Sequence, residues 1–219
     1  MVVLDNSAYL HARDRFAWHL PAPPSLIALA ALAVGFTGLV LQGFEDNSLA
    51  FATQLVWRFN CLVFFTALVA APVGRLIPQF AMLADKSRPL LQGFCAAMAV
   101  YFGFILLPNL FAVPDGVRPA GITAGMTAFV LFTGSVTLVM SAAASQRLCA
   151  QVGGKACRTM LGVAAIYFWL CYGLIGLAHI SGPHRHDPFY ELSVMLMVVA
   201  LLVRFADRFF ENRNPAPAA

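Results

Sequence analysis

The sequence has few charged residues. Only 11% of its 219 residues are Asp, Glu, Lys or Arg, whereas about a quarter are charged in a typical soluble protein. Hydrophobic residues make up 60% of the chain, and the mean hydropathy is +0.77. This composition excludes a water-soluble enzyme. The sequence also has no GxGxxG nucleotide fingerprint, no nucleophile elbow and no HExxH motif, so no active site of the soluble type is indicated.

The sequence contains several long runs without a charged residue. Several approach or exceed the roughly 20 residues that a helix needs to cross a bilayer, and Pro and Gly mark the joins between them. The sequence therefore predicts an all-α, polytopic membrane protein whose six transmembrane helices form a bundle within the lipid bilayer. The predicted spans are 25–44, 53–75, 90–111, 121–143, 158–180 and 189–209.

The basic residues predict the orientation of these spans. Eleven of the 14 Lys and Arg residues flank one set of alternate span ends, and only Arg118 and Arg185 flank the other. Because basic short loops stay in the cytoplasm, both termini are predicted to be cytoplasmic. Residues 25–210 then form the transmembrane domain, and residues 211–219 a flexible tail. Residues 1–24 form a cytoplasmic segment, which is either an amphipathic helix at the membrane surface or disordered. No basic run with aromatic residues indicates nucleic-acid binding.

The five cysteines are not expected to form disulfides. They lie within predicted spans or on the predicted cytoplasmic side, where disulfides rarely persist. One pair flanks the Gly153-Gly154 sequence in a cytoplasmic loop, but its spacing does not match a zinc site. The cysteines are Cys61, Cys95, Cys149, Cys157 and Cys171.

Arg58 lies inside the second predicted span, near its outer end. An ionisable residue in hydrocarbon is costly and is therefore a candidate functional residue. One interpretation is that its side chain snorkels to the outer headgroups or pairs with Glu45 or Asp46. The other is that it binds an anionic ligand, such as a cofactor carboxylate or a quinone oxygen.

A cluster of imidazoles lies at the outer end of the fifth span. His179, His184, His186 and Asp187 fall within nine residues, and such side chains can bind Zn, Cu or Fe. The alternative is a solvated loop at headgroup level, and Arg185 between two of the imidazoles disfavours a cation. A metal site here would face the periplasm.

Small residues within the spans predict close contacts between helices. Gly121 and Gly125 form a GxxxG pattern in the fourth span, which Gly134 continues, and Gly173 and Gly176 mark the fifth. The alternative is that glycine is simply common in membrane helices.

Several blocks of sequence resemble a known family. They are Thr53 to Trp57 with Thr66 to Arg75 in the second span, Ser87 to Leu91 entering the third, Gly121 to Met126 opening the fourth, and Phe189 to Arg204 in the last. With these blocks the chain resembles the ferric reductase-like transmembrane domain family over roughly residues 25–210. It is most similar to the small six-helix bacterial branch that includes the haem subunit of the periplasmic methionine sulfoxide reductase system. The resemblance implies a multi-pass protein of the bacterial inner membrane, related to electron transport.

The resemblance also gives the positions at which the family binds haem. The family's ligands are histidines, whereas the matching positions here are Tyr101, Thr159 and Tyr172. Imidazole is a usual axial ligand of a membrane haem, tyrosinate is rarer and threonine is poor. The resemblance therefore predicts the family's scaffold without its cofactor. The tyrosines, including Tyr167, then either fill the vacated space by packing or have a redox or ligand role.

The resulting hypothesis is a haem-free accessory or scaffold subunit that pairs with another membrane protein or a periplasmic protein. The alternative is a transmembrane electron-transfer subunit, dependent on haem b or a metal ion, with ligands other than the family's histidines, such as those around His179. A solute transporter is less well supported, because paired broken helices and buried acidic residues are missing.

Overall fold

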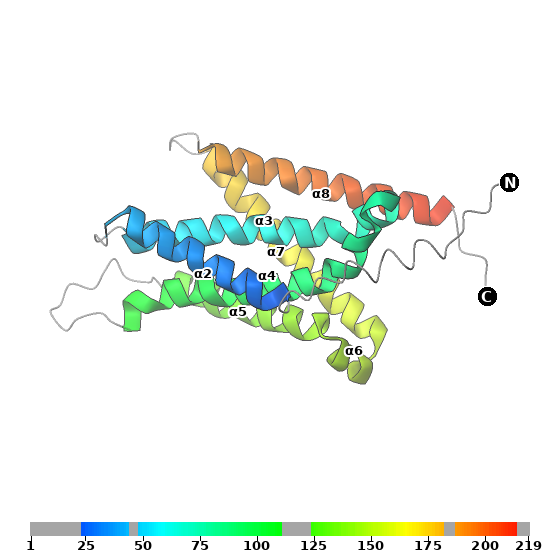
Figure 1. The fold of residues 1–219 in the computed structure, drawn as a ribbon, viewed down its shortest axis with the longest axis horizontal. Helices are drawn as coiled ribbons and strands as arrows, with labels where there is room; N and C mark the ends of the chain where they lie inside the picture. The colour runs from blue at the N-terminus through cyan, green and yellow to red at the C-terminus, as the bar shows by residue number, and fades with distance from the viewer. Residues whose placement is uncertain (1–22, 44–47, 111–123, 182–186, 214–219) are drawn as a thin grey trace.

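The computed structural model describes residues 23–43, 48–110, 124–181 and 187–213 (Figure 1). All regular secondary structure in these ranges is helical, as the sequence predicts. The predicted N-terminal segment lies almost entirely outside the described residues, as does most of the predicted C-terminal tail. The elements are α2 (Pro23–Leu41), α3 (Ser48–Leu76), the 3₁₀ turn η1 (Pro78–Phe80), α4 (Ala81–Leu110), α5 (Ala124–Ala144), α6 (Gln146–Val152), α7 (Gly154–Ser181) and α8 (Pro188–Arg213).

Five of the described helices are long and apolar enough to cross a membrane. They are α2, α3, α4, α7 and α8. α5 is a further apolar helix of 21 residues without a charged side chain, and its stretch Ala128–Ala144 is shorter than the other five. Length and composition thus indicate a membrane protein.

Some helices extend well beyond the predicted spans. α3 begins at Ser48 instead of residue 53, and α4 begins at Ala81 instead of residue 90. The added residues of α3 are uncharged and mostly apolar, whereas those of α4 include Asp85, Lys86 and Arg88, and the helix continues through both. Even Pro89 lies within α4, so a proline at the edge of an apolar run did not end the helix.

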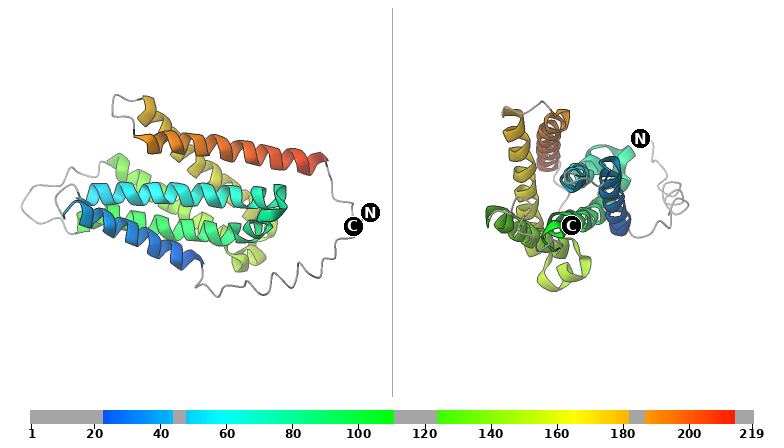
Figure 2. Two further views of the ribbon diagram at one scale, coloured as in Figure 1. Left: turned by 45° about the horizontal axis from the view of Figure 1, so that its top comes forward. Right: turned by 90° about the vertical axis from the view of Figure 1, so that its left-hand side faces the viewer.

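The long helices alternate in direction, and five of them contact one another in a closed ring. The contacts run from α3 to α4, α5, α7, α8 and back to α3. α2 lies outside this ring and packs in the angle between α3 and α4. The view along the helices shows α7 and α8 on one side and α2, α3 and α4 on the other (Figure 2).

Glycines permit some of these contacts. A Cβ atom on Gly38 would lie 2.8 Å from the Cα atom of Ala52, so the backbones of α2 and α3 approach closely. A Cβ atom on Gly173 or Gly176 would instead meet side chains of α8, those of Met197 and Val194, so α8 packs closely on these glycines as predicted.

The predicted small-residue face of the fourth span is different. Gly134 has only Phe102 nearby, at 3.9 Å from an added Cβ atom, so no helix packs closely against it. Gly121 lies outside the described residues, and the side-chain surroundings of position 125 are not described either.

We predict that Gly38→Ala destabilises the protein and that Gly162→Ala does not. The new methyl group at position 38 meets backbone, which cannot move aside cheaply, and such overpacking costs about 1–3 kcal/mol. A Cβ atom on Gly162 meets nothing within 4 Å. Thermal unfolding of both variants in one detergent checks this. Equal melting temperatures would contradict the close α2–α3 contact.

Candidate functional site

Two arginines of α3 pair with two aspartates, one directly before α8 and one within it. Near one end, Arg58 Nη2 donates to Asp187 Oδ2, and these side chains are 27% and 28% exposed. Near the other end, Arg75 donates from Nε to Asp207 Oδ1, at 2.9 Å, and from Nη2 to Oδ2. The two ion pairs therefore join α3 and α8 at both ends of their contact.

Arg58 is paired, as one interpretation of the sequence held, but with a different partner. The predicted partners, Glu45 and Asp46, lie outside the described residues. The observed partner, Asp187, is 129 residues away in the chain, and no sequence pattern connects the two positions. Arg58 Nε is buried and has no hydrogen-bond partner among the described residues. The prediction that Arg58 binds an anionic ligand stays a prediction.

Asp187 also begins helix α8. Its Oδ1 accepts a hydrogen bond from the backbone N–H of Phe189, at 3.1 Å, and Pro188 occupies the first helical position. An aspartate cap followed by proline is a favoured helix start. The Arg58 guanidinium also lies 5.2 Å from the centre of the Phe189 ring. Arg58 therefore holds the beginning of α8 by two contacts, the ion pair with Asp187 and the contact with the Phe189 ring.

The structure gives Asp187 a role other than the predicted metal ligand. Both of its oxygens are engaged, one by Arg58 and one by the helix cap. The His179 ring stacks on Tyr190 at 3.9 Å, and its Nδ1 atom lies 2.8 Å from the Ile175 carbonyl oxygen. His184 and His186 lie outside the described residues. Among the residues that are described, no three His, Cys, Asp or Glu side chains form a group able to hold a metal ion.

Two of the three positions that match the family's haem ligands come together. The Trp57 ring lies 5.3 Å from that of Tyr101 and 4.4 Å from that of Tyr172. Thr159 does not join them. It is exposed near the beginning of α7, donates to the Lys155 carbonyl oxygen at 3.2 Å, and lies about 20 Å along the helix from Tyr172. Thr159 therefore does not converge with the two tyrosines on one interior pocket.

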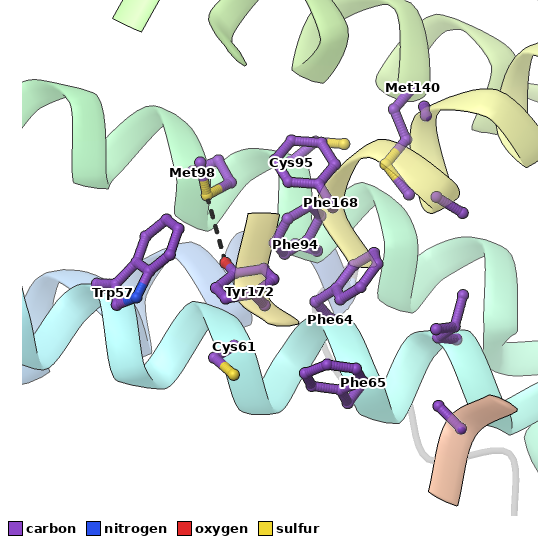
Figure 3. Packing of buried hydrophobic residues seen from close by; sticks show 14 residues of the cluster. Trp57, Cys61, Phe64, Phe65, Phe94, Cys95, Met98, Met140, Phe168 and Tyr172 are labelled. Carbon is purple, nitrogen blue, oxygen red and sulfur yellow. Dashed lines mark hydrogen bonds between the residues drawn. The ribbon is translucent and has the colours of Figure 1, made fainter. Parts of the chain in front are cut away.

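An aromatic core fills the space between α3, α4 and α7 (Figure 3). Tyr172 is 1% exposed, stacks against Phe64 at 5.6 Å, and directs its hydroxyl at Met98 Sδ, 3.9 Å away. Phe168 packs edge-on against Phe94 at 4.9 Å. We define the aromatic core as Trp57, Phe64, Phe94, Phe168 and Tyr172.

The residues of this region do not fit a haem. The aromatic core offers packed rings and contains no imidazole. Tyr172 contributes its ring to the packing, and the Tyr167 hydroxyl lies 2.7 Å from Thr133 Oγ1 on α5. Both tyrosines thus make contacts between helices, in line with the packing interpretation.

A buried asparagine was missed by the sequence analysis. Asn60 is fully buried in α3, and its Nδ2 donates to the Ala97 carbonyl oxygen of α4, at 3.2 Å. Its Oδ1 has no hydrogen-bond partner among the described residues. The signal was present, because Asn60 is an uncharged polar residue in an apolar run beside Arg58.

The prediction that the cysteines stay unpaired is wrong for two of them. Cys149 of α6 and Cys157 of α7 are joined as a disulfide, with Cα atoms 5.7 Å apart. Gly153 between them has a φ of 100°, a backbone conformation that suits glycine, and this turn folds α6 back towards α7. The prediction was based on the reducing cytoplasm, whereas the turn at Gly153 brings the two cysteines together.

A groove of about 790 Å³ lies along α4 and α5. Small side chains line much of it, including Ala96, Ala99 and Gly103 of α4 and Gly134 of α5. Polar side chains, Gln92 and Ser141 among them, line it nearer the end of the bundle that carries α6. The groove is open at the surface of the bundle and is separate from the aromatic core.

Comparisons with known proteins give no match: no family model, no curated protein and no solved structure matches this chain. The function is therefore argued from the residues described above.

We predict that Asp187→Asn and Asp187→Ala separate the two roles of this aspartate. Asparagine keeps the helix cap but loses the charge that pairs with Arg58, whereas alanine loses both. Losing a hydrogen bond to a charged group costs about 1.5–3 kcal/mol, and losing the cap costs about 1 kcal/mol more. Thermal unfolding in detergent should therefore rank wild type above Asp187→Asn and Asp187→Asn above Asp187→Ala. Wild-type stability of Asp187→Ala would refute both roles.

Proposed function

We propose that the chain is a six-span protein of the bacterial inner membrane with both termini in the cytoplasm. α5 supports the sixth span, because 21 residues of helix extend about 31 Å, close to the thickness of the hydrocarbon layer. The basic residues support the orientation. Those in the described ranges, Arg58 apart, gather at the end of the bundle where α6 and the α3–α4 turn lie (Figure 1), and such residues favour the cytoplasm.

We further propose that this protein is a haem-free accessory or scaffold subunit of the ferric reductase-like kind. The observation that carries this proposal is the aromatic core. Tyr172 stands at a position where the resemblance places a haem ligand, and it is fully packed among phenylalanine rings. The interior of the ring of helices is held together by side-chain packing, so the scaffold is complete without a cofactor.

The groove along α4 and α5 is the observation that favours a partner protein. Small residues along a membrane helix let another helix approach closely. On α4 the groove runs from Gln92 to Leu106, which is about 21 Å of helix. This length exceeds one leaflet, about half of the 30 Å hydrocarbon layer. The groove therefore suits a membrane-crossing helix better than the acyl chain of a single lipid.

His179 supports a second candidate, the electron-transfer subunit with haem b or a metal ion. Its Nδ1 atom lies at the Ile175 carbonyl oxygen and its ring is exposed, so Nε2 is available as a ligand. One imidazole at the outer end would serve only one side of the membrane, and electron transfer across about 30 Å needs a second, inner cofactor. This candidate is therefore the weaker one.

An absorption spectrum distinguishes the two candidates. The protein is expressed with haem supplied, purified in detergent, and measured oxidised and dithionite-reduced, with metal content determined on the same sample. We expect no Soret band and no stoichiometric metal. A stoichiometric Soret band that survives in Tyr101→Phe and Tyr172→Phe but disappears in His179→Ala would establish the second candidate instead.

We predict that Ala99→Trp weakens binding of a partner helix, because the indole fills the groove. Val163→Trp is the matched control, since Val163 is exposed on α7 away from the groove. Membrane proteins that purify in stoichiometric amount with the wild type should be lost from the first variant and retained by the second. Retention by both variants, with unchanged yield and monodispersity, would show that the groove is not the partner site.

A further inference from the structure

The Cys149–Cys157 pair lies at the end of the bundle that carries most of the basic residues. Cys149 is 8% exposed and Cys157 is 4% exposed, and α6 packs on both α5 and α7 beside them. The α3–α4 turn and the end of α8 lie at the same end of the bundle (Figure 1), and their sequences also carry basic residues. In the proposed orientation, this end faces the cytoplasm.

A disulfide in the cytoplasm is seldom a permanent structural bond. Cytosolic thiol systems keep cysteines reduced, and the disulfides found there in mesophiles are usually transient, catalytic or redox-sensing. The backbone nevertheless holds these two cysteines at a separation, 5.7 Å between Cα atoms, that is typical of disulfides. A pair prearranged for bonding in a reducing compartment suits reversible oxidation.

Cys157 lies at the beginning of a long helix and between two basic residues in the sequence. Cys157 lies in the first turn of α7, a helix of 28 residues, and its N–H donates to the Gly153 carbonyl oxygen at 3.2 Å. Lys155 and Arg158 are close to it in sequence, and Arg158 Nε donates to the Gly154 carbonyl oxygen. Thiolates are stabilised at helix N-termini and beside cations.

We propose that Cys149 and Cys157 are a reversible dithiol–disulfide switch that fastens α6 to the beginning of α7. The oxidation state of the switch follows that of small cytoplasmic thiols such as glutathione. This inference rests on the proposed orientation of the chain, in which α6 is cytoplasmic.

Oxidation proceeds by two thiol–disulfide exchanges. The Cys157 thiolate attacks glutathione disulfide, forms a mixed disulfide and releases one glutathione thiolate. Cys149 loses its proton to solvent and its sulfur attacks Cys157 Sγ, which releases the second glutathione thiolate. Two electrons pass from the cysteine pair to glutathione disulfide, and excess reduced glutathione reverses both steps.

Reduction leaves the short helix α6 held to α5 and α7 by noncovalent packing. α6 has seven residues, and isolated helices shorter than about 12–15 residues are marginal in water. Gly153 and Gly154 beside it have no atoms within 4 Å of an added Cβ position, so this turn has room to move. When α6 opens, both sulfurs become accessible to solvent, which makes the reverse exchange possible.

The test is differential thiol labelling of the full-length protein in bacterial cells. Free thiols are blocked with N-ethylmaleimide, disulfides are then reduced, and the released thiols are tagged with a polyethylene-glycol maleimide. We expect no tag in untreated cells, two tags after treatment with diamide, and loss of both tags after recovery. Cys157→Ser should abolish both diamide-dependent tags, and Cys149→Ser should leave at most one, from the mixed disulfide that Cys157 then keeps. Cys171→Ser, outside the pair, should leave both tags.

Two outcomes would overturn the switch, and they differ in what they say about orientation. If diamide adds no tag to the wild type, the cysteines do not pair, and the proposed orientation is unaffected. If the pair is fully tagged in untreated cells and is reduced only by a membrane-impermeant phosphine at the periplasmic face, the bond is a structural disulfide. In that case the proposed orientation fails as well.

Discussion

The cost of charge in hydrocarbon controls how α3 and α8 associate. Arg58 and Arg75 are 17 residues apart on α3, about 25 Å, and their partners Asp187 and Asp207 are 20 residues apart on α8, about 30 Å. Both distances are close to the thickness of a hydrocarbon layer. The two ion pairs are thus spaced about as far apart as the two boundaries of a membrane, and an axial shift of α8 by one turn would break both pairs. The ion pairs therefore set the register of α8 and help to close the ring of helices.

Closing the ring determines what its interior must contain. Membrane helices gain no hydrophobic driving force from meeting each other, so close packing and polar contacts hold them together. Here Trp57, Phe64 and Tyr172 bridge α3 and α7 through ring contacts of 4.4 and 5.6 Å, of a kind worth about 0.5–1.5 kcal/mol per pair beyond area burial. Asn60 adds a hydrogen bond to α4. These side-chain contacts hold α3, α4 and α7 together in the interior of the ring.

The parts of the fold that depend on composition were predictable, and those that depend on distant pairs were not. Uncharged runs located the helices because crossing a membrane requires apolar length. The partner of Arg58 could not be found, since 129 residues separate it from Asp187 and the neighbouring histidines made that aspartate resemble a metal ligand. Thr159 was placed by counting along a family pattern, and the structure puts it at the opposite end of α7 from His179. The disulfide depends on the turn at Gly153. The general rarity of disulfides in the cytoplasm gives no information about that turn.

The contacts at the two ends of the bundle differ in how they relate to the groove along α4 and α5. The Arg58–Asp187 ion pair holds the beginning of α8, and the aromatic core packs the middle of the ring of helices. α6 is different, because it packs on α5 and α7 and is fastened by a bond between two cysteines. α5 also forms one wall of the groove, through Gly134, Leu138 and Ser141. A change in the hold of α6 therefore acts first on α5 and α7, and through α5 on one wall of the groove.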